Sequence, residues 1–516
     1  MRANPLHPDP VMHPNPAAEH TVMLKRGSFG PPRTEQPRTD PRTQRPAAGV
    51  SSIHALGESR LPQATVDHRV AGEIKKRVAD RLAQEIKSSA RMSPESQAQR
   101  GRALINEAVA VWSDAIAVER GASTTQAEDA ALASAVYDML FRAGRLQPYL
   151  DDERVENILI NGYDEVWLDY GDSERVRVAP VADSDEELQE MLRDLARRTG
   201  QSERTLSTAD PFLALRLADG SRLQAVTGVT PKTFVTIRRH RVKDVDLEGM
   251  MRLGAIDETL ATFLAAAVRA EKNIMITGEQ AVGKTSLLRA LLKEIDPDER
   301  FATIETEFEL FAHTNGFHRQ VVPMESRESN GERGSDGRGA GEITLLDLIH
   351  RALRMSLSRV VVGEVRGQEI VAMMQAMTNG KGGNLCTIHA RRPEIVFDRI
   401  AELYLLAQDN MTEQLAYRQA ANGLDFIVFV SMRDETRIEG KRHRFVSHVL
   451  EVTGMGENGR PATNRIFAPR PGEPRAVPHM HPACLEDLVR VGFPVHLLDN
   501  PRGSWPRPLD LQVMAG

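Results

Sequence analysis

The sequence is poor in the residues that mark several large classes of protein. Only two cysteines, Cys386 and Cys484, occur in its 516 residues, which suits a reducing compartment and excludes a framework of disulfides. Aromatic residues make up 5%, so stacking platforms for single-stranded nucleic acid are scarce. The formal net charge of −6 provides no general basic field. Composition therefore gives no support to nucleic-acid binding.

Long apolar runs are also missing. No run approaches the length of roughly 20 residues that spans a bilayer, and the N-terminus lacks the compact apolar core of a signal peptide. We therefore expect a cytoplasmic protein. The hydrophobic content of 41% is enough for at least two cores, and a norm of about 150 residues per domain suggests about three domains.

The N-terminal part of the chain divides into two segments. Residues 1–64 are rich in Pro, Arg and Thr and predict a disordered tail. Residues 65–145 predict a helical bundle, because apolar residues from Val66 to Ile86 recur four apart. Ser93 and Pro94 supply an N-cap and a first-turn proline for a second helix, and residues 124–142 predict a third.

Three further segments follow. Residues 146–246 contain short alternating runs, such as 155–160 and 234–237, between turn glycines, which predicts an α+β domain with an antiparallel sheet. Residues 247–470 alternate helical and apolar-strand patterns and predict a parallel α/β domain. Within it, the polar stretch 326–339 predicts an inserted loop. Residues 471–516 form a C-terminal extension.

A phosphate-loop pattern, GxxxxGK(S/T), opens the predicted α/β domain. It follows an apolar run typical of a buried strand, residues 273–277, and precedes leucines at helical spacing. In such a loop the backbone N–H groups wrap a β-phosphate at the start of a helix, Lys284 reaches the β and γ oxygens, and Thr285 ligates Mg²⁺. The predicted nucleotide-binding residues of the loop are Gly278, Glu279, Gln280, Ala281, Val282, Gly283, Lys284, Thr285 and Ser286. The alternative is a chance loop between a strand and a helix.

Two carboxylates follow apolar runs further along. Glu364 comes directly after residues 360–362, which predict a buried strand, and so lies at the carboxyl edge of a parallel sheet, where ligands sit. Its alternative role is that of a helix N-cap. Glu305 ends another apolar run, residues 302–304, and is the second candidate carboxylate.

The series of spaced motifs resembles the secretion traffic ATPases of type II and type IV systems. It is most similar to the CpaF-type ATPases that power Tad (Flp) pilus assembly, over roughly residues 146–470. Residues 363–367 look like the family's Walker B motif, residues 301–310 like its aspartate box and residues 382–390 like its histidine box.

This resemblance implies a hexameric ATP hydrolase with a RecA-like P-loop domain that uses ATP and Mg²⁺. The implied catalytic residues are Glu364, Glu305 and Lys284, with Mg²⁺ held by Thr285 and, through water, by Glu364. His389 would contact the phosphate region, and Arg222 and Arg238 would reach the nucleotide from the α+β domain. A structural histidine and surface arginines are the alternatives for these three.

The resemblance also implies partners and a location. The chain would assemble with copies of itself and would pass force to an inner-membrane platform protein. It would lie in the cytoplasm, peripheral to the membrane, and contact that membrane only indirectly. Arg354 and Arg366 are further candidates for sensing charge between subunits. Glu309 and His313 stand in family-like register, although either could cap a turn.

Three departures from the family pattern bear on the expected rate of hydrolysis. The loop from Glu279 to Val282 is poorer in Gly, Ser and Thr than in many members and adds a carboxylate near the phosphates. Thr306 stands where the aspartate box usually has Asp, and Leu357 with Ser358 replaces the usual Pro-Asp. We expect these changes to affect ATP affinity and turnover rather than the fold.

Three other hypotheses remain. A nucleic-acid translocase, such as a conjugation-type motor, would use the same class of sheet, and salt-dependent DNA binding would reveal it. A nucleotide-gated scaffold would bind ATP without turnover. Zinc-type ligands occur as Cys386 with His389, and as His479 and His481 with Cys484, at spacings that are only suggestive of a metal site.

Overall fold

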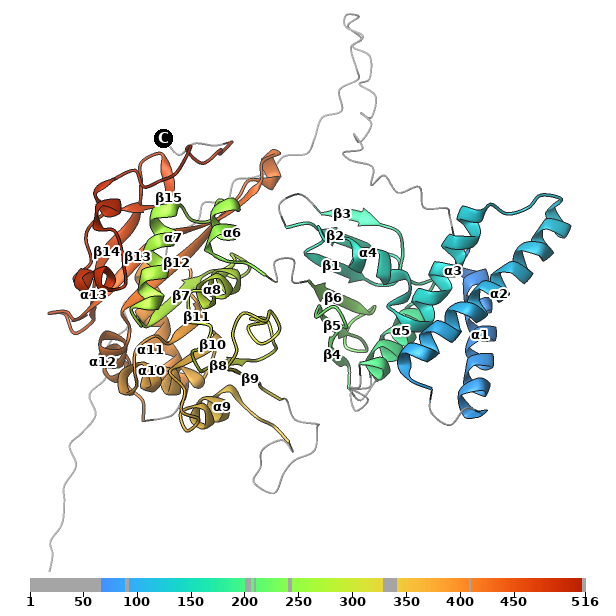
Figure 1. Cartoon of the computed structure of the whole chain (residues 1–516), viewed down its shortest axis with the longest axis horizontal. Coiled ribbons are helices and arrows are strands. Elements are labelled where there is room, and N and C mark those ends of the chain that lie inside the picture. Colours follow the sequence, from blue (N-terminus) through green and yellow to red (C-terminus); the bar gives the residue numbers. More distant parts are fainter. Residues whose placement is uncertain are drawn as a thin grey trace, which may run out of the picture. The chain divides into compact units, whose positions relative to one another are not determined.

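The computed structural model describes residues 66–512, apart from 89–91, 172, 174, 200–205, 208–209, 240–243, 328–340 and 408–409. The predicted disordered tail, residues 1–64, and most of the predicted inserted loop lie outside the described residues. The described part is an α/β fold with two sheets and a group of N-terminal helices (Figure 1). None of the helices described there is long and apolar enough to cross a membrane.

The N-terminal helices pack around a small apolar core. They are α1 (His68–Ser88), α2 (Pro94–Arg120) and α3 (Gln126–Phe141). The apolar stripe of α1 buries Ile74 and Val78 against residues of α2 and α3. Ser93 caps α2, and Thr125 forms a capping box with Glu128 at the start of α3, so the side chains at both N-caps bond first-turn N–H groups.

The first sheet has six strands and is antiparallel throughout. Its strands are β1 (Asn157–Asn161), β2 (Val166–Asp169), β3 (Val176–Val178), β4 (Phe212–Arg216), β5 (Arg222–Val226) and β6 (Phe234–Arg238), in the order β3-β2-β1-β6-β5-β4. Helices α4 (Gln147–Asp151) and α5 (Asp185–Arg198) accompany it, and α5 buries Leu188 and Leu192 in its core. The register pairs Arg222 with Arg238, so these two arginines lie side by side.

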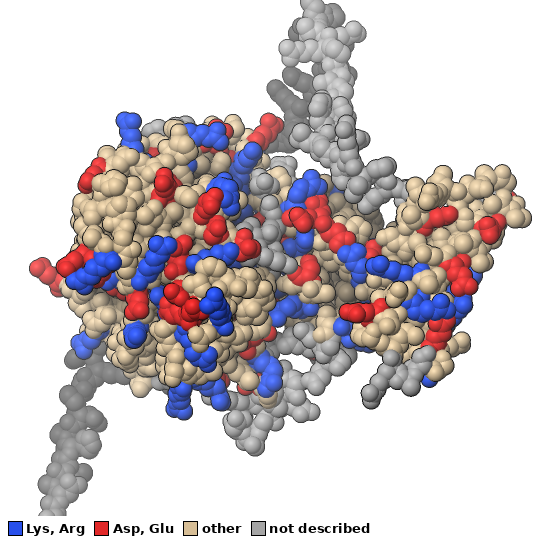
Figure 2. All heavy atoms as spheres, viewed as in Figure 1, with Lys and Arg blue, Asp and Glu red and all other residues tan. Residues whose placement is uncertain are grey.

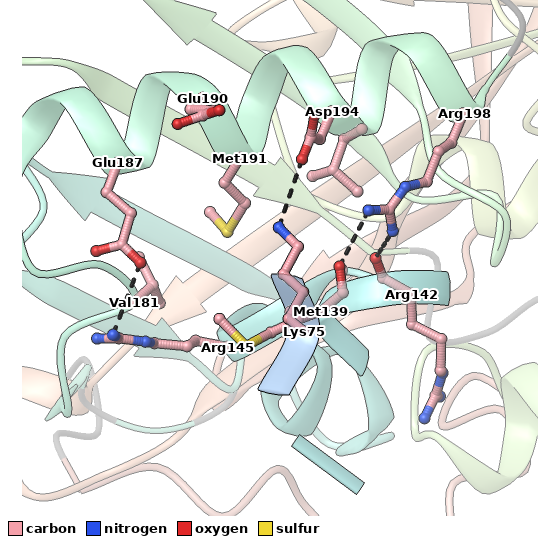
Figure 3. A pocket seen from close by; sticks show the side chains of 13 residues that line it. Lys75, Met139, Arg142, Arg145, Val181, Glu187, Glu190, Met191, Asp194 and Arg198 are labelled. Carbon is pink, nitrogen blue, oxygen red and sulfur yellow. Dashed lines mark hydrogen bonds and ion pairs between the residues drawn. The ribbon is translucent and has the colours of Figure 1, made fainter. Parts of the chain in front are cut away.

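Polar contacts connect the N-terminal helices to α5 around a small cavity of about 90 Å³ (Figure 3). Lys75 of α1 lies 3.8 Å from the carboxylate of Asp194. Arg198 donates to the backbone carbonyls of Met139 and Arg142, at 3.0 and 2.7 Å. Because the last carbonyls of a helix have no partner within it, Arg198 completes the end of α3 and holds it against α5.

The second sheet has nine strands, with six parallel strands followed by three antiparallel ones. Its strands are β7 (Ile274–Gly278), β8 (Phe301–Glu305), β9 (Val321–Glu325), β10 (Arg359–Val365), β11 (Leu385–His389), β12 (Phe426–Asp434), β13 (Arg442–Met455), β14 (Pro461–Arg470) and β15 (Glu473–Pro478). The order is β15-β14-β13-β12-β7-β11-β10-β8-β9. The parallel part runs from β12 to β9, so the carboxyl ends of these six strands meet at one edge.

Helices cover both faces of this sheet. The first face carries α6 (Leu247–Arg252), α7 (Glu258–Arg269), α8 (Lys284–Leu292) and α13 (Leu485–Arg490); the second carries α9 (Leu345–Ala352), α10 (Glu369–Asn379), α11 (Val396–Ala407) and α12 (Glu413–Gly423). Alternate residues of β7 enter the two cores: Ile274 and Ile276 pack with the first group and Met275 with the second. The central strands are therefore buried on both sides, as is usual for parallel sheets.

The surface carries charges of both signs. On the face drawn in Figure 2, Lys and Arg side chains are interspersed with Asp and Glu side chains over the described residues. A nucleic-acid backbone is bound best by a continuous basic stripe, and the mixed charges of this face do not form one.

Candidate nucleotide-binding site

The predicted phosphate loop connects β7 to α8 in a backbone conformation that requires glycine at two points. Gly278 has φ 148 and Gly283 has φ 101, both outside the range that side chains tolerate well. A Cβ on Gly278 would stand 2.2 Å from the carbonyl oxygen of Val430. Ala281 also has a positive φ, of 61. The loop therefore turns tightly at the carboxyl end of β7 and aims the start of α8 at a cavity.

Lys284 lies within this loop and is largely buried. Its Nζ donates to the carbonyl oxygens of Gly278, at 3.1 Å, and Glu279, at 2.7 Å. Burial lowers the pKa of Lys284 to about 8, although the charge of Glu364 works in the opposite direction. An ammonium group held in this way is poised for an anionic ligand, because a negative charge nearby would favour its protonated form.

His389 connects Lys284 to Glu364. The Lys284 Nζ lies 3.1 Å from His389 Nδ1, and His389 Nε2 lies 2.5 Å from a carboxylate oxygen of Glu364. An imidazole that accepts from the ammonium and donates to the carboxylate carries its proton on Nε2. Each side chain comes from the carboxyl edge of the sheet, from α8, β11 and β10 respectively.

Glu364 faces the cavity, and its charged form is favoured by its neighbours. Burial works to raise the pKa of Glu364, but the hydrogen bond from His389 and the charge of Arg366 outweigh burial and lower it. Arg366 Nε lies 3.4 Å from the carboxylate. Glu364 is thus a carboxylate that can accept hydrogen bonds or contact a metal-bound water.

Glu305 lies at the end of β8, beside Glu364's strand, in a different environment. Only 2% of it is exposed, and its Oε2 accepts from the backbone N–H groups of Glu309 and Leu310, both at 2.8 Å. Burial raises the pKa of its carboxyl to about 7. Its Oε1 is buried without a hydrogen-bond partner among the described residues. Glu305 does not line the cavity, whereas Glu364 does.

The antiparallel sheet contributes arginines to the same cavity. Arg222 and Arg238 both line it. The Arg222 guanidinium pairs with the carboxylates of Glu307 and Glu309, with Nη1 3.0 Å from Glu309, and donates to the Glu307 carbonyl at 2.9 Å. Acidic residues after β8 therefore hold an arginine of β5 at this site.

The cavity has a volume of about 790 Å³, within the usual range for small-ligand sites. Its lining includes the following predicted residues: Gln280, Ala281, Val282, Gly283, Lys284, Thr285, Ser286, Arg222, Arg238, Glu364 and His389. Gly278 and Glu279 belong to the loop without lining the cavity, and they contact Lys284 through their carbonyls. The cations suit a polyphosphate, while the Thr285 hydroxyl and the Glu364 carboxylate are the oxygen ligands that Mg²⁺ prefers.

Of the other candidates, Arg366 and Glu309 line the cavity, whereas Arg354 and His313 do not. Arg354 is exposed and does not line it, and the ring of His313 packs 4.8 Å from that of Phe308. Thr306 accepts from Arg366 Nη2 at 2.9 Å, so the residue in place of the expected Asp still holds a partner. No group of three zinc-type ligands comes together in the described ranges.

Several cavity residues were not predicted from sequence. Arg289 lies among the leucines of α8 and lines the cavity. A charged residue at a buried helix position was the one sequence signal that could have identified it. Burial lowers the pKa of Arg289 to about 10. Glu156 and the run from Lys441 to Arg444 also line the cavity. No local pattern marks them, because their position depends on how two distant segments fold over the loop.

The chain is similar to proteins of secretion and transfer systems. The profile described as "Type II/IV secretion system protein" matches residues 141–423. A protein of Mycobacterium tuberculosis with the provisional name of a conjugal transfer protein is 33% identical over 270 residues, which are 51% of this chain and 72% of that protein. The type IV secretion system protein VirB11 of Brucella suis is 28% identical over 337 residues, covering 60% of this chain and 89% of that protein.

Solved structures match as well. The VirB11 ATPase of the Brucella suis type IV secretion system, in complex with sulphate, is 25% identical, and the match covers 61% of this chain and 94% of that chain with a TM-score of 0.31. The family profile spans more than half of the sequence and includes the phosphate loop, Glu364 and His389. The chain therefore belongs to the type II/IV secretion system protein family and is a P-loop ATPase of that family.

Proposed function

We propose that this protein is a hexameric, ATP-hydrolysing motor of the CpaF type, which powers Tad (Flp) pilus assembly or protein secretion across a membrane. Turnover is supported most directly by His389, which contacts both Lys284 and Glu364 at the carboxyl edge of the parallel sheet. They face the same cavity as Arg222 and Arg238. The proposed RecA-like ATPase domain spans residues 247–470, after an α+β domain at 146–246 and a helical bundle at 65–145.

The loop residues would bind the phosphates of ATP. The N-terminus of α8 favours negative charge, and Lys284 would exchange its bonds to the Gly278 and Glu279 carbonyls for phosphate oxygens. Thr285 and, through water, Glu364 would hold Mg²⁺, which when bound neutralises charge on the β and γ phosphates. Because a phosphate is a stronger partner for an ammonium than a carbonyl is, nucleotide binding would fix the Lys284 side chain.

Glu364 is the better placed of the two candidate bases. It lines the cavity, and its neighbours favour the carboxylate form, so it could orient the attacking water and accept its proton. His389 donates to that carboxylate and would position it. Glu305 is buried beside it with a raised pKa and would support the segment that carries Glu307 and Glu309.

Motion would come from the arginines of the antiparallel sheet. Arg222 is bound to Glu307 and Glu309, and a γ-phosphate in the cavity would compete for its guanidinium. Contacts of Arg222 and Arg238 with the γ-phosphate would favour a closed arrangement, and hydrolysis would remove those contacts. The cycle would thus convert phosphate release into movement of one domain against the other.

The proposed setting is the cytoplasmic face of a membrane. There the hexamer would deliver force to an inner-membrane platform protein, with only indirect contact to lipid. This part of the proposal is supported by membership of the secretion family and by the names of the relatives in Mycobacterium tuberculosis and Brucella suis. The CpaF subtype is supported by the motif series described from the sequence.

The test combines turnover, assembly and pilus formation. We expect the purified protein to hydrolyse ATP as a hexamer, and Glu364→Gln to lose about two orders of magnitude in kcat while still binding ATP and assembling. In a strain that lacks its own copy of the gene, wild type should restore surface pili or secretion and Glu364→Gln should not. Undiminished hydrolysis by the variant would contradict the role of Glu364, and restoration by the variant would contradict the motor.

A second candidate function is a nucleic-acid translocase, which the name of the Mycobacterium tuberculosis relative favours. DNA binding that weakens steeply between about 50 and 200 mM salt would support it. ATP hydrolysis that DNA does not stimulate, together with restored pili, would favour the first proposal. A scaffold without turnover would bind ATP as a hexamer and leave it intact.

A further inference from the structure

The phosphate loop receives a hydrogen bond from outside its own motif. Arg444, near the start of β13, donates from Nε to the carbonyl oxygen of Ala281 at 3.0 Å. Ala281 is the residue of the loop that takes a left-handed backbone, φ 61, without being glycine. Side chains adopt this region at a cost in free energy, so the loop needs a contact that favours it.

The register of the sheet explains how Arg444 reaches the loop. β12 pairs in parallel with β7, and Val430 lies opposite Gly278, the last residue of β7. β12 continues past this point, and Met432 pairs with Arg444 of β13. The hairpin of β12 and β13 therefore extends beyond the carboxyl edge of the parallel sheet and places Arg444 directly over the loop.

A second contact orients the guanidinium. Arg444 Nη2 lies 3.3 and 3.4 Å from the two carboxylate oxygens of Glu156, the residue just before β1. Both side chains are mostly shielded, with 27% of Arg444 and 21% of Glu156 exposed. A guanidinium presents its donors in a rigid fork, so the pairing with Glu156 turns Nε toward the Ala281 carbonyl.

We propose that Arg444 is a positioning residue for ATP binding, which holds the phosphate loop in its binding conformation through the carbonyl of Ala281 and is itself oriented by Glu156. This inference rests on the ATP-driven motor proposed above. If a smaller fraction of the loop adopts the binding conformation, the apparent affinity for ATP falls by the same factor. Arg444 therefore acts on nucleotide affinity through the backbone of the loop rather than through a contact with the nucleotide.

The proposal predicts a specific coupling between positions 281 and 444. Arg444→Ala removes one hydrogen bond from the strained carbonyl and should raise the Kd for ATP about fivefold. In an Ala281→Gly background the left-handed conformation costs little, so the same substitution should raise Kd less than about twofold. Competition of ATP against a fluorescent ATP analogue measures all four variants of this cycle.

Two further variants guard against a simple folding defect. Arg444→Lys keeps a donor and a positive charge and should recover part of the lost affinity. Glu156→Gln should weaken binding more in the wild-type background than in the Ala281→Gly background. Arg433→Ala is the matched control, because Arg433 is exposed on the same hairpin and does not line the cavity. Its Kd should equal that of wild type.

The outcomes are distinct. An equal loss of affinity for Arg444→Ala in both backgrounds would mean that Arg444 contacts the nucleotide itself, and an unchanged Kd would mean that it does nothing for binding; either overturns the proposal. Lys284→Ala serves as the binding-defective reference. If wild type binds no more ATP than Lys284→Ala does, the proposed motor fails, whereas a normal wild type with an inert Arg444 removes only this inference.

Discussion

The two edges of the parallel sheet both carry buried polar side chains, but these side chains differ in charge and in their hydrogen bonding. At the amino edge, Asn273 and Asn384 are almost fully buried. Asn273 Oδ1 accepts two bonds from Asn384, and its Nδ2 donates to two backbone carbonyls, at 3.1 and 2.7 Å. Asn384 Oδ1 accepts from the N–H of Val360. At this edge the side chains of Asn273 and Asn384 therefore form a closed network of neutral amides with the surrounding backbone.

The carboxyl edge is charged and open to a cavity. His389 contacts both Lys284 and Glu364 there, and the pKa of Lys284 is lowered to about 8 by burial. Glu305 lies behind them with a buried oxygen that has no partner in the described part of the chain. A network that satisfies every donor adds stability, whereas one that keeps charges desolvated and exchangeable costs stability and can bind a ligand. Within one sheet, the amide network of the amino edge therefore adds stability, and the charged carboxyl edge is arranged to bind a ligand.

The largest effect is expected at Lys284. Lys284→Ala removes the cation that would meet the phosphates and should lower kcat/KM for ATP hydrolysis about a thousandfold, with little change in Tm. Steady-state hydrolysis measures this. Lys76→Ala, on the exposed side of α1, is the matched control. Comparable activity in both variants would mean that the carboxyl edge is not the catalytic one.

The next largest effect is expected at Glu305, whose burial lowers the stability of the folded state at neutral pH. Its folded pKa of about 7 exceeds the ordinary value of 4.5, so between these two pH values the folded state keeps a proton that the unfolded state releases. Stability is therefore lost as pH rises from about 4.5 to about 7. Relative to wild type, Glu305→Gln should gain about 3 kcal/mol between about pH 4.5 and about pH 8. Denaturant unfolding at both pH values tests this, and a difference that does not vary with pH would contradict it.

The amino edge should respond in stability alone. Asn273→Ala leaves buried donors and acceptors of Asn384 and the neighbouring backbone without partners, and should cost about 2 kcal/mol of unfolding free energy. The kcat of the folded variant should match wild type within about twofold. A large loss of kcat at unchanged stability would break the distinction between the edges.

The smallest effect is expected at Ser358, which precedes β10 at the same amino edge. Its hydroxyl lies 2.5 Å from a carboxylate oxygen of Glu299 and 3.0 Å from the Arg300 carbonyl oxygen. Because it is only partly buried, Ser358→Ala should cost about 1 kcal/mol or less and leave ATP hydrolysis unchanged. Thermal unfolding and turnover of the same preparation measure both quantities. A marked fall in turnover would show that this departure from the family pattern affects catalysis.

Sequence reasoning was strongest where the relevant geometry is local. The phosphate loop is a continuous run between a strand and a helix, and Glu364 and His389 each follow an apolar strand pattern. Strands of a parallel sheet share one carboxyl edge, so Glu364 and His389 could be expected to lie close together. The structure places His389 Nε2 2.5 Å from a carboxylate oxygen of Glu364. The roles of these residues remain predictions.

The remaining features depend on contacts between distant segments. Glu305 ends its strand as expected, but the following residues fold back so that their N–H groups bind its carboxylate, and strand patterns carry no information about that turn. Arg444 reaches Ala281 only because two antiparallel strands extend beyond their neighbours. The length of that extension depends on pairing rather than on local propensity.

Strand β12 has a mechanical consequence. It begins beside Asn273, whose carbonyl accepts the N–H of Phe426, and ends in the hairpin above the phosphate loop. Its nine residues measure about 30 Å at the rise of an extended strand, and much of that length is hydrogen-bonded on both sides. If a partner pulled on the hairpin, strand β12 would stretch little, because it is hydrogen-bonded along much of its length and is held at the amino edge. Arg444 and the phosphate loop would therefore be displaced together.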